Sequence, residues 1–152
     1  MDKHYAEKQK KIVEPLIVSL ANFRLMVFDD KFERHLKGDT SKMSDIEKSY
    51  IWFTHVFNEL MEKVDLDKYE GIIDEKLFSI LKDLYFNMCL FVDAFIKMDE
   101  VVLGKSRPSL QLLIFKTRKV YDYQLDVTGD NIQKYYAKMQ QRLKELFPEL
   151  NK

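Results

Sequence analysis

Basic side chains recur at regular spacing in the last third of the chain, where they could bind a polyanion. Lys134, Lys138 and Arg142 stand four residues apart, so on a helix they share one side. A second basic cluster and nearby tyrosines extend the set: Lys116, Arg118, Lys119, Tyr121, Tyr123 and Tyr135. Basic groups interleaved with aromatic rings can grip phosphates and stack on bases. The six basic residues are therefore candidate polyanion contacts.

The overall charge argues against a dedicated nucleic-acid binder. The chain has 25 basic and 25 acidic residues, and its pI is near 6.8. Residues 104–144 hold 9 basic and 3 acidic groups (net +6), whereas residues 29–103 hold 10 basic and 17 acidic groups (net −7). This asymmetry either attracts an acidic partner or lets the two regions lie against each other. We favour the second interpretation and a solvated lysine face, so a nucleic-acid partner is not expected.

Catalytic and metal-binding patterns are scarce. The histidines His4, His35 and His55 lie far apart in sequence, and no Glu-x-x-His pair of the di-metal bundle type occurs. Cys89 is the only cysteine, which excludes an intramolecular disulfide and a cysteine-rich zinc site, and we expect it to be a buried structural thiol. No glycine-rich phosphate loop or Gly-x-Ser-x-Gly elbow is present. We predict a protein without enzymatic activity, metal or cofactor.

Aromatic residues are the distinctive part of the composition. Eleven Phe, eight Tyr and one Trp supply bulky core material, and they leave room for a cavity that binds an apolar small molecule. Met88, Phe91 and Phe95 are the candidate walls of such a cavity, because they share one side of the most apolar predicted helix.

That helix is predicted at about residues 75–103. Its apolar residues recur at alternating steps of four and three: Leu77, Leu81, Leu84, Met88, Phe91, Phe95, Met98 and Val102. A second apolar set lies beside the first: Phe78, Tyr85, Cys89, Val92, Ile96 and Leu103. A helix that is apolar around most of its circumference is usually buried between neighbours. We therefore expect the other elements to surround it.

The first half of the chain predicts two more helices. Residues 2–37 share a seam of Val13, Leu16, Leu20, Phe23 and Val27, and Pro15 predicts a kink or a start near Glu14. Residues 1–13 are very polar, so we expect them to fray or project, or to be the stub of a longer chain. Ser44 with Glu47 forms a capping box for a helix that ends near Val64, and Asp74 is placed to cap the helix at 75–103.

The C-terminal third is the most ambiguous stretch. Residues 110–127 fit a helix, yet the alternation of Tyr121, Tyr123, Leu125 and Val127 also fits a β-hairpin. We favour the helix, because a lone hairpin needs a sheet to join. After Gly129, Asp130 is predicted to cap a separate last helix that ends at Pro148.

Together these patterns predict one all-α domain over residues 1–152, a bundle of about five helices around the central helix at 75–103. No segment is long and apolar enough to insert in a membrane, and we expect a cytoplasmic protein. The favoured function is a non-enzymatic protein-interaction or regulatory module, whose partner is another protein or a second copy of the chain. The alternatives are a sensor with an apolar ligand in the aromatic core, and nucleic-acid contact through the basic C-terminal third.

Overall fold

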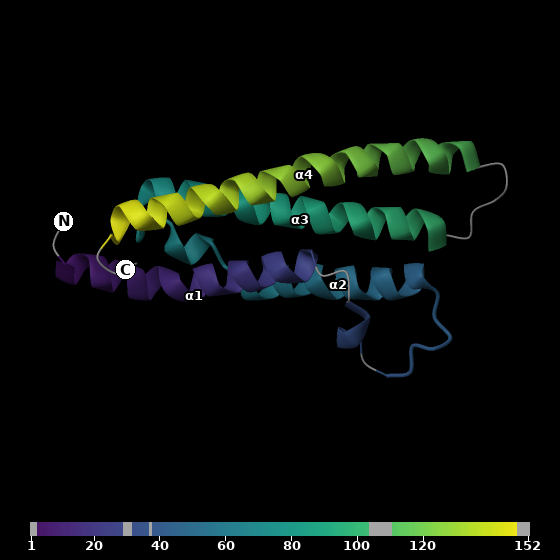
Figure 1. The fold of residues 1–152 in the computed structure, drawn as a ribbon, viewed down its shortest axis with the longest axis horizontal. Coiled ribbons are helices and arrows are strands. Elements are labelled where there is room, and N and C mark those ends of the chain that lie inside the picture. Colours follow the sequence, from purple (N-terminus) through teal and green to yellow (C-terminus); the bar gives the residue numbers. More distant parts are fainter. Residues whose placement is uncertain (1–2, 29–31, 37, 104–110, 149–152) are drawn as a thin grey trace.

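The computed structural model describes residues 3–28, 32–36, 38–103 and 111–148, and it confirms an all-α bundle (Figure 1). The described chain contains no strand. Its elements, in order, are α1 (Lys3–Val27), the 3₁₀ helix η1 (Phe32–His35), α2 (Asp45–Lys63), the 3₁₀ helix η2 (Asp67–Tyr69), α3 (Glu75–Leu103) and α4 (Gln111–Leu146). The stretch from residue 111 to 127 is thus helical, as favoured over the hairpin.

The helices form two layers. α3 and α4 run antiparallel in one layer, and α1 and α2 make up the other (Figure 1). α3 packs against all three other helices. The apolar seam predicted for the first helix is buried throughout: Val13, Leu16, Leu20, Phe23 and Val27. The start of α1 and the end of α4 lie at the same end of the bundle (Figure 1).

The prediction of five helices is wrong in the C-terminal third. α4 runs without interruption from Gln111 to Leu146, so Gly129 does not end a helix and Asp130 does not cap one. Only Gly38 and Gly71 have positive φ among the described glycines. A Cβ at Gly129 would lie 3.3 Å from Cε2 of Phe91. The glycine therefore allows α4 to approach α3 closely.

The central helix is also less enclosed than expected. Phe86, on the outer side of α3, is 61% exposed, because α1, α2 and α4 cover only part of the helix and no further α-helix of the described residues covers the rest. The first helix likewise ends at Val27, ten residues earlier than predicted. Since α1 begins at Lys3, ahead of Pro15, the alternative start near Glu14 is wrong.

Local capping signals are confirmed. The amide of Glu47 donates to Oγ of Ser44 over 3.2 Å, and the amide of Ser44 donates to Oε1 of Glu47 over 3.3 Å. Asp74 caps α3, because its Oδ2 accepts from the amide of Leu77 at 2.9 Å. These bonds satisfy amides that a helix start leaves without a partner.

Side-chain hydrogen bonds fix the register between α3 and α4. Nδ2 of Asn131 donates to Oδ1 of Asn87 over 3.0 Å, and Nε2 of Gln124 donates to the carbonyl of Leu90 over 2.9 Å. Asn87 is buried, so sliding one helix along the other would leave its Oδ1 without a donor. That loss is costly in a packed interior.

No helix in the described part of the chain has an apolar stretch long enough to cross a lipid bilayer.

We expect Phe91→Ala to lower the free energy of unfolding by about 3–5 kcal/mol, because it empties a packed site. Phe86→Ala, on the exposed side of the same helix, should cost less than about 0.5 kcal/mol. Urea denaturation of the two variants measures both values. Equal losses would show that the two faces of α3 are not distinct.

Gly129→Leu should destabilise by about 1–3 kcal/mol, because the larger side chain forces Phe91 to move. Gly129→Ala should stay within about 1 kcal/mol of wild type, since better helix propensity offsets the tight contact. Thermal melts of both variants test this. A leucine variant as stable as the alanine variant would contradict the close contact between Gly129 and Phe91.

Candidate functional site

Arg142 joins the end of α4 to the start of α3. Its Nε and Nη2 donate to the two carboxylate oxygens of Asp74 over 2.9 and 2.8 Å, and its Nη1 donates to Oε2 of Glu145 over 2.9 Å. The hydrogen bond from Arg142 holds the pKa of the Asp74 carboxyl below its usual value. Arg142 is one of the candidate polyanion contacts. Its guanidinium is instead occupied by these bonds, which hold the end of α4 against the start of α3.

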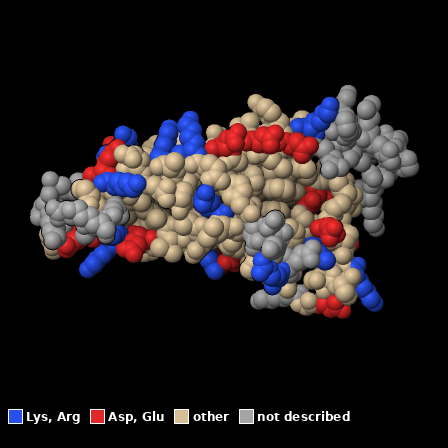
Figure 2. Space-filling model, viewed as in Figure 1, with Lys and Arg blue, Asp and Glu red and all other residues tan. Residues whose placement is uncertain are grey.

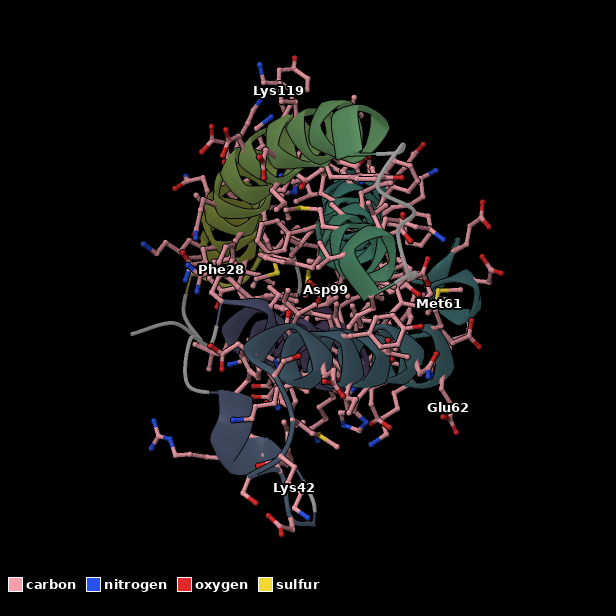
Figure 3. The ribbon with its side chains drawn as sticks, turned by 90° about the vertical axis from the view of Figure 1, so that its right-hand side faces the viewer. Phe28, Lys42, Met61, Glu62, Asp99 and Lys119 are labelled. Carbon is pink, nitrogen blue, oxygen red and sulfur yellow. The ribbon has the colours of Figure 1, made fainter. Side chains whose placement is uncertain are left out.

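The other candidate polyanion contacts lie along α4. Lys134 and Lys138 are exposed, with their Nζ atoms 5.7 and 5.3 Å from the ring centre of Tyr135. Lys119 projects away from the bundle (Figure 3). The side chains of Lys116 and Arg118 lie outside the described residues.

Acidic residues interrupt this basic set. Asp122, Asp126 and Asp130 are exposed and four residues apart, and they lie between Lys119 and Lys134. Figure 2 shows the acidic side chains as a row over α4, with basic groups on either side. A phosphate backbone laid along this helix would meet three carboxylates. The structure therefore presents alternating blocks of charge here, and no continuous basic stripe.

Aromatic rings fill the space beside the predicted ligand site. The Phe91 ring lies 5.1 Å from Phe28 and 5.2 Å from Phe95, and Phe95 stacks on Phe53 with 4.3 Å between ring centres. Met88 is fully buried. The cavities found among the described residues have other walls. One, of about 70 Å³, lies at the far end of the bundle between Val13, Leu77, Leu146 and Phe147, among others.

A second hollow, of about 280 Å³, lies beside η1 and α2. Its walls are His35, Leu36, Ile51, Trp52 and His55. The two imidazole rings lie 5.1 and 5.9 Å from the ring of Trp52. Within the described residues, no group of three or more His, Cys, Asp or Glu side chains is placed to hold a metal ion.

Burial raises the pKa of three partly buried titratable groups of α3. Burial raises the pKa of the Cys89 thiol, and it raises the pKa of Tyr85 to about 12. Burial also raises the pKa of Asp99, whose carboxylate accepts a 2.8 Å hydrogen bond from Oγ of Ser49 on α2. Two of these groups link α3 to α2, since the Tyr85 hydroxyl donates to the carbonyl of Leu60 over 3.3 Å and Asp99 accepts from Ser49.

Exposed apolar residues on α4 form the surface that sequence reasoning missed. Val120, Tyr123 and Val127 are 63%, 72% and 39% exposed, and their spacing places them on one side of the helix. We call this side, together with the charged residues beside it, the outer face of α4. This surface could have been predicted from the alternation of Tyr121, Tyr123, Leu125 and Val127. On a continuous helix Tyr121 and Leu125 turn inward, while Tyr123 and Val127 turn outward.

Comparisons with protein-family models, with curated proteins and with solved structures found no match for this chain.

Arg142→Gln should lower the free energy of unfolding at pH 7 by about 1 kcal/mol, because it breaks the joint to Asp74. Lys138→Gln should change it by less than about 0.5 kcal/mol. Asp74 has a folded-state pKa below its usual 3.8, so the ion pair stabilises the fold above that pH. The difference in the free energy of unfolding between wild type and Arg142→Gln should shrink as pH falls below 3.8, because Asp74 becomes protonated in both proteins. Denaturation curves at pH 7 and at pH 3 measure it, and an unchanged difference would contradict the assignment.

Proposed function

We propose that this protein is a non-enzymatic interaction module that binds another protein chain through the outer face of α4. The observation that carries the proposal is the exposure of Val120, Tyr123 and Val127 on one side of a long helix. Contiguous apolar groups with a polar surround mark interaction sites on soluble proteins.

The position of Tyr123 supports a protein partner. It is the most exposed apolar side chain of the described residues, at 72%. Tyrosine is enriched at the energetic centres of interfaces, because it combines a large apolar ring with a hydroxyl that can form hydrogen bonds. Val120 and Val127 flank it, so a partner would cover a strip about two helical turns long.

The charges on the outer face favour a protein over a polyanion or a lipid surface. Asp122, Asp126 and Asp130 accompany the apolar strip, whereas anionic lipids and nucleic acids attract uninterrupted basic surfaces. A protein can match both signs of charge side by side.

The outer face is also rigid before any partner arrives. The opposite side of α4 is fixed by Ile132 and Met139, which are fully buried, and by the hydrogen bond between Asn131 and Asn87. A preordered helix loses little conformational freedom on binding, so less of the contact energy is lost to ordering.

A small-molecule sensor has less support. The rings around Phe91 and Phe95 contact one another, and the hollows found among the described residues lie elsewhere.

The test combines Tyr123→Glu with Val127→Glu. Capture of partner chains from an extract of the source cells should fall by at least about tenfold, because the change places charge in the apolar strip. The matched control is Val18→Glu with Leu25→Glu, two equally exposed apolar positions on α1, which should capture as wild type does. Equal capture by both double variants would refute the proposal, and thermal melts confirm that each variant is folded.

A further inference from the structure

The charges on the outer face of α4 form one row with an ordered pattern. Asp122, Asp126, Asp130, Lys134 and Lys138 stand four residues apart, and all five are exposed. Residues at this spacing form a continuous ridge that is inclined to the helix axis. Along the ridge three acidic side chains are followed by two basic ones, and the top edge of Figure 2 shows a red row with blue side chains beside it.

The pattern is not explained within a single chain. Like charges four residues apart destabilise a helix, whereas alternating charges would stabilise it. The helix dipole acts only within the first and last turns, and the ridge lies more than a turn from both Gln111 and Leu146. Within the described residues no ion pair joins these five side chains to another group. The Nζ atoms of the two lysines lie near the ring of Tyr135, and Lys138 also lines a hollow with Lys76 and Arg142.

From this ridge we propose that the partner of the outer face is a second copy of the chain, paired through antiparallel α4 helices about a two-fold axis beside Ile132. This rests on the proposed function and names its partner. Asp130 and Lys134 lie symmetrically on either side of Ile132, and so do Asp126 and Lys138. In the antiparallel pair Asp126 and Asp130 therefore each meet a lysine of the other copy, and each of these contacts occurs twice.

The packing geometry suits this pairing. The commonest packing of two helices aligns their ridges of every fourth residue at a crossing angle of about −50°. The two charged ridges then run side by side in opposite directions. Val127 and Ala137 are exposed beside the ridge, so apolar surface lies next to the central charge pairs.

The contact is modest in size, and this sets the expected strength. The ridge spans roughly 25 Å at the rise of an α-helix, and one pair of helices buries less than a standard stable interface. We expect a reversible dimer that weakens as salt rises, because exposed charge pairs are screened.

The experiment uses two charge variants of the full chain. Asp126→Lys with Asp130→Lys makes the ridge basic between positions 126 and 138, and Lys134→Glu with Lys138→Glu makes it acidic. Sedimentation at low salt should show the wild type as a dimer. The affinity of dimerisation of each variant should be lower by at least about tenfold, because every cross-pair becomes repulsive. An equimolar mixture of the two variants should restore the dimer, since all four cross-pairs again join opposite charges.

The control is Glu14→Lys with Glu62→Lys, exposed positions on α1 and α2 that change the net charge by the same amount as the basic variant. It should dimerise as wild type does. Circular dichroism melts verify that all variants fold.

Three results would overturn the pairing: a wild type that stays monomeric, a control that loses the dimer equally, or a mixture that stays monomeric. Their meaning for the proposed function differs. A monomeric wild type that still captures another protein through Tyr123 and Val127 removes only the second copy as partner. A monomeric wild type whose capture does not depend on those residues removes both proposals.

Discussion

The close contact between α3 and α4 is the constraint on which the rest of the structure depends. Gly129 lets the two backbones approach until Phe91 lies against α4, and the bond between Asn131 and Asn87 sets their register. Close packing and a buried hydrogen bond together fix the position of α4 along α3, because any shift would lose both. The pair then serves as a platform on which α1 and α2 pack.

The same contact determines what α4 displays. The inner side of the helix is buried at Thr128, Ile132, Met139 and Leu146, so the opposite side is supported from behind and faces solvent. Tyr123, Val127 and the charged ridge owe their fixed spacing to this support. Both proposals use that rigid face, since a surface that is ordered in the free protein loses little entropy when it binds.

Basic residues of one helix have different roles for electrostatic reasons. Arg142 faces Asp74 across the α3–α4 contact, and its planar guanidinium forms two parallel hydrogen bonds with the carboxylate. Lys134 and Lys138 lie farther around the helix, where no acidic group of the described chain reaches them. The regularly spaced basic residues of α4 are thus divided between a structural joint at Arg142 and an outward-facing ridge at Lys134 and Lys138.

The sequence by itself determined the helical class, the buried seam of α1, the capping box at Ser44 and the cap at Asp74. These features depend on residues within about one turn of each other, so periodicity and local hydrogen-bonding chemistry are enough to predict them. The tertiary structure alone decided the continuity of α4, the exposure of Phe86 and Tyr123, and the pairing of Arg142 with Asp74. Gly129 shows the reason: a glycine can end a helix or admit a neighbouring side chain, and the choice depends on Phe91, which is distant in sequence and adjacent only after folding.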